Sequence, residues 1–244
     1  MIVLVHGVPE TVALWDKVRA ELHQESVALS LPGFGCARPD GFAATKDDYA
    51  SWLTTQLEGF DGPVDLVGHD WGALLAYRVI STRGDLLRSW ISDVGNGAHP
   101  DARWHTLAQT WQTPGDGEDF FERLLSTSVE SAAQGFERLH LDRDDALTVA
   151  SWCDPTMATC ILDLYRSAMP NIHADWGRQF AATSVPGLIL HAEFDVFANE
   201  ANSREVAETF SARHETLHGV GHWWALEDPR GAASVIEEFI GSIN

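Results

Sequence analysis

The sequence is short of basic residues. It holds 16 Lys and Arg against 36 Asp and Glu in 244 residues, which gives a formal net charge of −20. Nucleic acids and anionic membranes are bound through clustered Lys and Arg, so this balance argues against both as partners. We therefore expect a neutral small molecule as the ligand. The sequence leaves open whether the protein forms a homodimer.

Cysteine and long apolar runs are also scarce. The three cysteines are an odd number and lack the spacing of a metal site, which argues against a disulfide framework or a zinc centre. No apolar run reaches the ~20 residues that cross a membrane, and the chain enters an expected strand at Ile2, with no room for a signal peptide. We expect a cytoplasmic protein that needs no metal and no cofactor.

Strand and helix patterns alternate along much of the chain. Apolar runs closed by glycine, such as MIVLVHG and SVALSLPG, alternate with stretches whose apolar residues recur every three or four positions, such as DDYASWLTTQLEGF. Strands that are apolar throughout are typical of a parallel sheet buried between helices. The sequence therefore predicts an α/β fold.

The alternation stops in the middle of the chain. From about Gly97 to Ala182 no strand pattern occurs, and the segment is polar, helix-prone and rich in tryptophan. Strand patterns return at PGLILHAEFD and HETLHGVGHW, and a last helix pattern follows, DPRGAASVIEEFIG. We predict a core made of residues 1–96 and 183–244, with a helical cap, residues 97–182, inserted into it.

Residues 67–73 read VGHDWGA, which is the frame of a nucleophile elbow, G-x-S-x-G, with Asp70 in place of the serine. A carboxylate attacks amides and ordinary esters poorly, but it can displace a leaving group from saturated carbon and form an alkyl ester. Hydrolysis of that ester needs a base for water, usually a histidine held by a second carboxylate. Asp70 therefore predicts hydrolysis in two steps.

Two later residues fit the chain order of nucleophile, acid and histidine. Asp195 follows the strand pattern GLILHAEFD, and His222 lies in GVGHWW after the next strand. Loops that leave buried parallel strands meet at the carboxyl edge of the sheet, where ligands bind. Singly, each residue is also typical of a turn or a surface position. Asp93 is an alternative acid, although we prefer it as the cap of a strand end.

The negative charge that develops during ester hydrolysis needs backbone donors. The N–H groups of Trp71, directly after the nucleophile, and of Val8, in the loop HGVPE, are the candidates. A tight turn alone would also account for the glycine and proline of this loop.

Five segments of the sequence carry a resemblance to a known family: HGVPE, LPGFG, GHDWGA, the FD of the penultimate strand pattern and the GHW before the last helix. They resemble the α/β-hydrolase-fold epoxide hydrolases and their haloalkane dehalogenase relatives. The likeness spans about residues 2–93 and 186–241, whereas the cap matches poorly. It implies the α/β-hydrolase fold with a mostly parallel sheet of about six strands, since this sequence begins at the HGxP strand. It also implies a cis Val8–Pro9 bond and hydrolysis of an epoxide to a vicinal diol.

Epoxide hydrolases supply a proton donor to the leaving oxygen from cap tyrosines. The segment LYRSAMPN is similar to one that bears such a tyrosine and indicates Tyr165, although a tyrosine on an apolar helix face is common in general. At the place of the second tyrosine stands Leu107, and His105 is the substitute we consider. Three tryptophans complete the expected pocket: Trp104, Trp111 and Trp223.

Two alternative functions stay open. Trp71 resembles one half of the halide clamp of haloalkane dehalogenases, and Trp104 or Trp111 could supply the other half, since Val8 replaces the asparagine that often does so. The fold is also found in ligand-binding receptors and lyase-like proteins. A receptor would have no need of the complete set of nucleophile, acid and histidine, which favours an enzyme.

Overall fold

The structure is a computed structural model that describes residues 1–243. Its strands form one six-stranded sheet in the order β2-β1-β3-β4-β5-β6, and all neighbouring strands are parallel. The strands are β1 (Ile2–Val5), β2 (Ser26–Leu29), β3 (Val64–Gly68), β4 (Leu87–Ser92), β5 (Gly187–Ala192) and β6 (Arg213–Leu217). The expected parallel sheet of six strands is confirmed.

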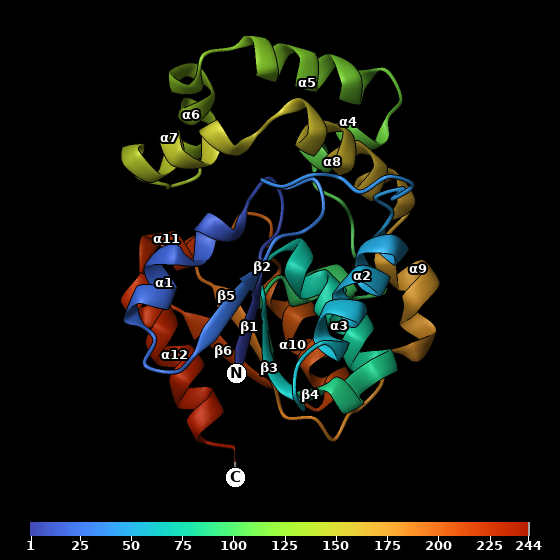
Figure 1. The fold of residues 1–244 in the computed structure, drawn as a ribbon, viewed down its shortest axis with the longest axis vertical. Coiled ribbons are helices and arrows are strands. Elements are labelled where there is room, and N and C mark those ends of the chain that lie inside the picture. The colour runs from blue at the N-terminus through green and yellow to red at the C-terminus, as the bar shows by residue number, and fades with distance from the viewer. Residues whose placement is uncertain (244) are drawn as a thin grey trace.

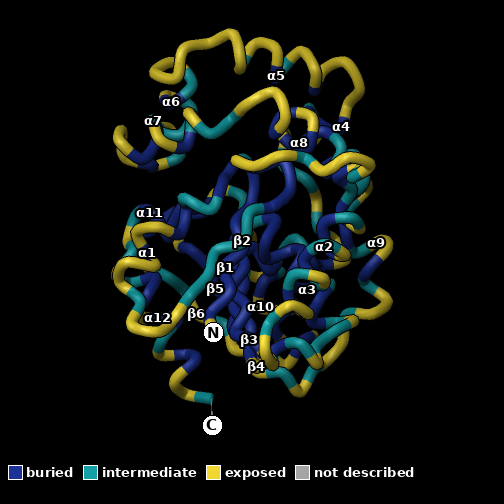
Figure 2. The backbone as a smooth tube through the Cα atoms, viewed as in Figure 1, coloured by how far each residue is buried: buried dark blue, intermediate teal, exposed yellow. Residues whose placement is uncertain are grey.

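Helices cover both faces of this sheet (Figure 1). On one face lie α1 (Asp16–Glu21), α11 (Trp224–Glu227) and α12 (Pro229–Gly241), and on the other α2 (Lys46–Glu58), α3 (Trp71–Arg83) and α10 (Glu200–Phe210). Successive strand residues point to opposite faces, so Ile2 and Leu4 pack with the first set of helices and Val3 and Val5 with the second. Burial on both faces explains why β1, β3 and β5 are rich in apolar residues, whereas the edge strand β6 is mostly polar and partly exposed (Figure 2).

Between β4 and β5 the described chain forms helices and no strand, as the sequence predicts. They are α4 (Thr106–Gln112), α5 (Asp116–Ser126), α6 (Val129–Glu137), α7 (Arg143–Trp152), α8 (Pro155–Ser167) and α9 (Ile172–Trp176). Helices α4 to α8 lie beyond the carboxyl ends of the strands, and the outer side of α5 is exposed (Figures 1 and 2). The division into core and cap at residues 97 and 182 stays a prediction.

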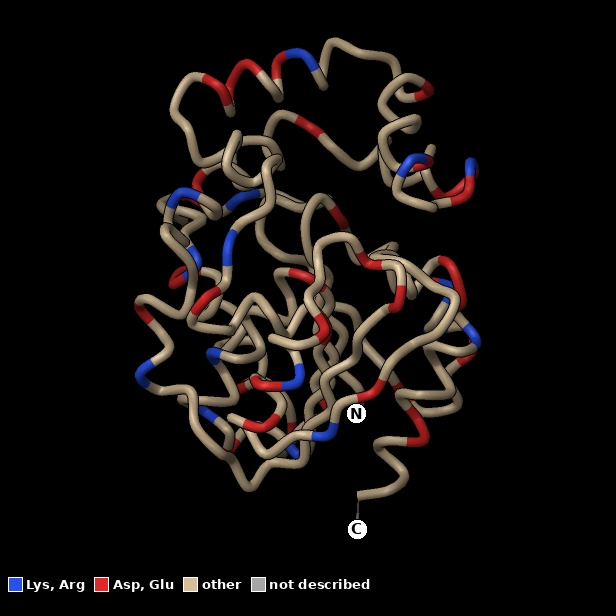
Figure 3. Tube along the Cα trace, turned by 180° about the vertical axis from the view of Figure 1, so that it is seen from behind, with Lys and Arg blue, Asp and Glu red and all other residues tan. Residues whose placement is uncertain are grey.

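Three ion pairs join the inserted helices to the rest of the chain: Lys17 with Asp145, Arg38 with Asp163 and Lys46 with Asp175. Acidic residues otherwise exceed basic ones over the whole molecule and do not gather in one place (Figure 3). Within residues 1–243, every helix is too short or too polar to cross a membrane. The Val8–Pro9 peptide bond is cis, as the resemblance implies.

Candidate active site

The segment VGHDWGA forms the sharp turn between β3 and α3. Asp70 caps the start of α3 with φ +50° and ψ −117°, a conformation that residues with a side chain rarely adopt. The turn fits because its glycines lack a Cβ. A Cβ on Gly72 would lie 2.3 Å from the Val5 carbonyl oxygen, and one on Gly68 would lie 2.5 Å from the Gly72 carbonyl oxygen. This packing brings the Asp70 side chain to the carboxyl edge of the sheet.

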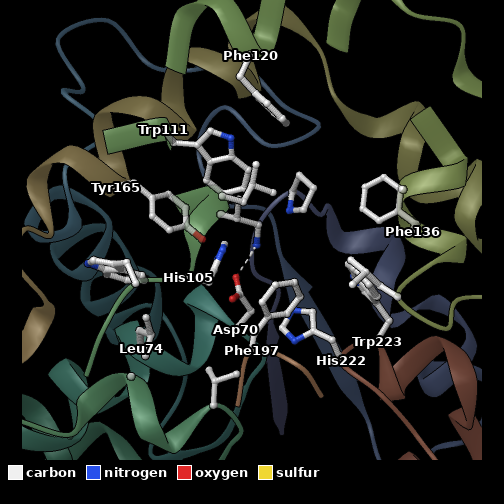
Figure 4. A pocket seen from close by; sticks show the side chains of 18 of the residues that line it. Asp70, Leu74, His105, Trp111, Phe120, Phe136, Tyr165, Phe197, His222 and Trp223 are labelled. Carbon is white, nitrogen blue, oxygen red and sulfur yellow. Dashed lines mark hydrogen bonds between the residues drawn. The ribbon is translucent and has the colours of Figure 1, made fainter. Parts of the chain in front are cut away.

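The Asp70 carboxylate is held by the loop after β1. The Val8 N–H donates a hydrogen bond of 2.8 Å to Oδ1 (Figure 4), which is the contact expected of an oxyanion donor. The loop approaches this closely because Gly7 has no side chain, since a Cβ there would lie 2.3 Å from the same oxygen. The corresponding role of the Trp71 N–H stays a prediction.

His222 and Asp195 form a buried pair, and His222 lies beside Asp70 (Figure 4). The distance from His222 Nδ1 to Asp195 Oδ2 is 2.9 Å, and the other carboxylate oxygen accepts the Phe197 N–H at 2.8 Å. Burial lowers the pKa of His222, but the charge and hydrogen bond of Asp195 outweigh it and raise that pKa to about 9. The other ring nitrogen, Nε2, takes no part in this pair.

Burial is the main cause that raises the pKa of Asp70, to about 6, and the attraction of His222 acts against it. Asp70 is therefore an ionised carboxylate above about pH 6. The structure thus brings together the three residues that the sequence analysis assigned to a nucleophile, an acid and a base.

A cavity of about 430 Å³ opens above Asp70. Its walls are mostly apolar, include several aromatic side chains, and come both from loops at the carboxyl ends of the strands and from the inserted helices. The residues expected from the sequence that line it are Val8, Asp70, Trp104, His105, Trp111, Tyr165, His222 and Trp223. Phe120, Phe136 and Phe197 also line it and were not foreseen (Figure 4). Trp71 lies behind this wall, with its ring stacked on Trp104 at 5.5 Å between centroids.

Tyr165 points its hydroxyl into the cavity on the side of Asp70 (Figure 4). Its ring is fixed by edge contacts with Trp104 and Trp111, at 5.1 and 4.9 Å between centroids. Burial and the charge of Asp70 raise the pKa of Tyr165 well above its ordinary value, so the hydroxyl stays protonated. It is a donor rather than a phenolate.

His105 is the second donor that faces the cavity. It caps the start of α4, where its Nδ1 accepts the Ala108 N–H at 3.2 Å. Burial lowers the pKa of His105 to about 4, so the ring is neutral. Because Nδ1 accepts, the one ring proton sits on Nε2. Leu107 also lines the cavity but offers no donor.

Asp93 is bound to His69 and not to His222. Its carboxylate also accepts the Asp70 N–H at 2.8 Å and the Trp224 indole N–H at 2.7 Å. The alternative assignment of Asp93 as the acid of the triad therefore lacks a contact with His222. The preferred role of Asp93 as the cap of a strand end accounts for only part of its contacts, because the residue also binds His69 and Trp224.

Glu10, His69 and His222 each offer one potential metal ligand atom, and these atoms lie within 4.8 Å of one another. Both nitrogens of His69 already contact carboxylates, those of Glu10 and Asp93, and Nδ1 of His222 contacts Asp195. These contacts are those of a hydrogen-bonded network.

A family model described as the alpha/beta hydrolase family matches residues 2–235. Among curated proteins, Epoxide hydrolase 3 of Xenopus tropicalis is 25% identical over an alignment 272 positions long, which covers 98% of this chain and 71% of that protein.

Solved structures give the same likeness. An epoxide hydrolase of Bacillus megaterium, in complex with an inhibitor, matches with a TM-score of 0.77 at 18% identity over 99% of this chain and 93% of that chain. A loop variant of a haloalkane dehalogenase from Bradyrhizobium elkanii matches with a TM-score of 0.69 at 20% identity, over 99% of this chain and 90% of that chain. At these identities the likeness shows the fold.

Replacement of Asp195 by Asn should lower the pKa of His222 well below about 9, because burial then acts without the main charge that opposes it. The measurement is a pH titration of the His222 ring by NMR. Glu193→Gln is the matched control, since Glu193 is an exposed carboxylate on the same turn and bonds to Gly219 and His218. An Asp195→Asn protein whose His222 titrates as in the wild type would contradict the pairing.

Proposed function

The chain belongs to the alpha/beta hydrolase family, and from this premise we propose that it hydrolyses an epoxide to a vicinal diol through a covalent ester on Asp70. The observation that carries the proposal is the carboxylate at the nucleophile turn, with one oxygen bound by the Val8 N–H and the His222–Asp195 pair beside it. The names of its curated relative and of its structural neighbour, both epoxide hydrolases, support the choice of substrate.

In the first half of the reaction, Asp70 Oδ2 attacks a carbon of the epoxide ring and the bond from that carbon to oxygen breaks. Oδ1 stays with the Val8 N–H. The epoxide oxygen leaves as an alkoxide and takes the hydroxyl proton of Tyr165, while the Nε2–H of His105 donates a hydrogen bond to the same oxygen. The products of this half are an uncharged alkyl ester on Asp70 and a tyrosinate.

Formation of the ester prepares His222 for the second half. The negative charge of Asp70 is one of the causes that raise the pKa of His222, and the ester no longer carries it. His222 therefore releases its proton, which restores the Tyr165 hydroxyl. The neutral ring then takes a proton from water, and the hydroxide attacks the Asp70 Cγ.

The tetrahedral intermediate places its negative charge on Oδ1, at the Val8 N–H and, in this proposal, the Trp71 N–H. Its collapse expels the diol oxygen, which takes the proton from His222. The new carboxylic acid of Asp70 returns its proton to His222, and the starting state is restored. Asp195 stabilises the imidazolium each time it forms.

We also propose that residues 97–182 act as the cap that closes the site. Helices α4, α5, α6 and α8 contribute most of the aromatic wall of the cavity and carry Tyr165. Such a wall excludes water from the alkylation step and suits a neutral, apolar epoxide.

Haloalkane dehalogenation is the second candidate. The indole N–H groups of Trp71 and Trp111 are buried and have no hydrogen-bond partner within the described residues. Trp111 lines the cavity, and Trp71 packs directly behind Tyr165, at 5.3 Å between ring centroids, so both indoles are candidate donors to a departing halide. The indole N–H of Trp104 is already bound to the Ala168 carbonyl oxygen at 3.0 Å, which removes Trp104 from that role.

The covalent step predicts an adduct that can be trapped. In His222→Gln the alkylation of Asp70 proceeds, but no base activates water, so the ester accumulates. Mass spectrometry of the variant incubated with styrene oxide should show one substrate mass added to the peptide that contains Asp70. Asp70→Asn is the control and should stay unmodified. An adduct on another residue, or none while the wild type turns over, would disprove the scheme.

The two leaving groups make opposite demands on Tyr165 and Trp71. For styrene oxide, Tyr165→Phe should slow alkylation by about 10²-fold to 10⁴-fold, the usual span of general acid help, and Trp71→Phe should have little effect. For 1-bromobutane the order should reverse. Rapid-quench measurement of each variant with both compounds gives the rates.

His105→Asn provides a matched variant for the second donor, because asparagine still caps α4 but does not carry a ring N–H into the cavity. We expect epoxide opening to slow by about 10²-fold, the low end of the range for such donors. If the Tyr165→Phe variant opens the epoxide at the wild-type rate, the assignment of Tyr165 is wrong. That result would favour His105 as the proton donor or a haloalkane as the substrate.

A further inference from the structure

Beneath the Asp70 turn lies a buried charged cluster that the proposed reaction does not use. The side chain of His69 is fully buried. Its Nδ1 is hydrogen-bonded to Asp93, and its Nε2 lies 3.0 Å from Glu10 Oε1. Both carboxylates are buried as well, and the edges of Trp15 and Trp224 cover the ring.

The other contacts of these two carboxylates are all with donors. Glu10 Oε2 accepts the Gly7 N–H at 2.8 Å, and Asp93 accepts the Asp70 N–H at 2.8 Å and the Trp224 indole N–H at 2.7 Å. Asp93 accepts a hydrogen bond on each of its oxygens, and the charge and hydrogen bond of His69 outweigh burial and lower the pKa of Glu10 to about 2, so that Glu10 is ionised. His69 must then donate from both ring nitrogens, which only the imidazolium can do. The charges of both carboxylates outweigh burial and raise the pKa of His69 well above its ordinary value.

Each carboxylate holds one of the two segments that carry an oxyanion donor. Glu10 binds the backbone of Gly7, directly before Val8, and Asp93 binds the backbone of Asp70, directly before Trp71. These segments follow β1 and β3, which are far apart in the sequence but adjacent in the sheet. His69 connects them through its two nitrogens.

We propose that His69 is a positioning residue, a buried cation that sets the separation of the Val8 and Trp71 N–H groups through Glu10 and Asp93. The kinetic part of this proposal rests on the covalent mechanism proposed above, whereas its protonation state does not. A displacement of about 1 Å at such donors costs on the order of 10²-fold in rate.

The cation also acts on the reacting groups directly. The rings of His69 and His222 lie 4.8 Å apart between centroids. The charge of His69 lowers the pKa of both Asp70 and His222, which favours an ionised nucleophile and an unprotonated base. The titratable groups that surround the ring are His6 and Glu10 after β1, Asp70 at the turn, Asp93 after β4, Asp195 after β5 and His222 after β6.

The protonation state can be tested without any substrate. In protein labelled with 15N in its histidine rings, both nitrogens of His69 should stay protonated from about pH 6 to about pH 9, where an ordinary histidine loses a proton. His69→Asn assigns the signals by their loss. A His69 ring with one unprotonated nitrogen at neutral pH would overturn the proposal, whether or not the protein opens epoxides.

The positioning role is tested by single turnover with styrene oxide. Asn at position 69 can still donate to Asp93 but carries no charge and does not reach Glu10. In His69→Asn the alkyl ester should hydrolyse about 10²-fold more slowly, the size of an oxyanion-donor effect, and the acid limb of alkylation should move to higher pH. Glu10→Gln, which keeps the side-chain size, should also slow ester hydrolysis and serves if His69→Asn does not fold. Its acid limb of alkylation should not move to higher pH, because the charge of Glu10 itself raises the pKa of Asp70.

Ser92→Ala is the matched control for lost stability, because Ser92 is buried next to Asp93 and its hydroxyl is hydrogen-bonded to that of Tyr77, at 2.7 Å. It should lower the melting temperature and leave ester hydrolysis within about 3-fold of the wild type, since no charge or oxyanion segment is touched. If folded His69→Asn or Glu10→Gln hydrolyses the ester at the wild-type rate, the proposal is wrong.

Discussion

The close packing of two backbone segments at the sheet edge is the constraint on which the site depends. Asp70 adopts a strained conformation, and Gly72 and Gly7 leave no room for a Cβ against Val5 and the Asp70 carboxylate. Strain of this kind, of order 1–3 kcal/mol, persists only where the surrounding structure imposes it. Here the sheet places β1 beside β3, so that the Val8 N–H meets the carboxylate directly.

Buried charges of alternating sign surround this turn. Six charged side chains lie at the carboxyl ends of the strands and form hydrogen bonds with one another or with the backbone: Asp195, His222, Asp70, His69, Glu10 and Asp93. A buried charge is tolerated when it is paired and hydrogen-bonded. In the proposed reaction, formation of the ester removes the negative charge of Asp70, and this lowers the pKa of His222. The first half of the reaction thereby prepares the base for the second half.

Local patterns made the sheet, the nucleophile turn and the partners of His222 predictable. Buried strands rich in apolar residues, such as β1 and β5, indicate a parallel sheet, and G-x-D-x-G is specific because the backbone there accepts only small residues. Helix α10 was not predicted from the sequence, because its Asn199 cap and half-exposed pattern resemble a polar loop. The last strand pattern was extended to HETLHGVGHW, whereas β6 ends at Leu217. The bond between His69 and Asp93 joins residues 24 positions apart, and no local signal marks it. The donor role of Nε2 in His105 likewise depends on a helix cap that only coordinates reveal.

The central claim is that water attacks the carboxylate of the enzyme and not the substrate. A single turnover of styrene oxide in H₂18O, with enzyme in excess, tests it most directly. The account predicts that the Asp70 peptide gains 18O while the diol contains only 16O, because the oxygen given to the diol comes from Asp70. A diol that carries 18O, with an unlabelled Asp70 peptide, would contradict the covalent mechanism.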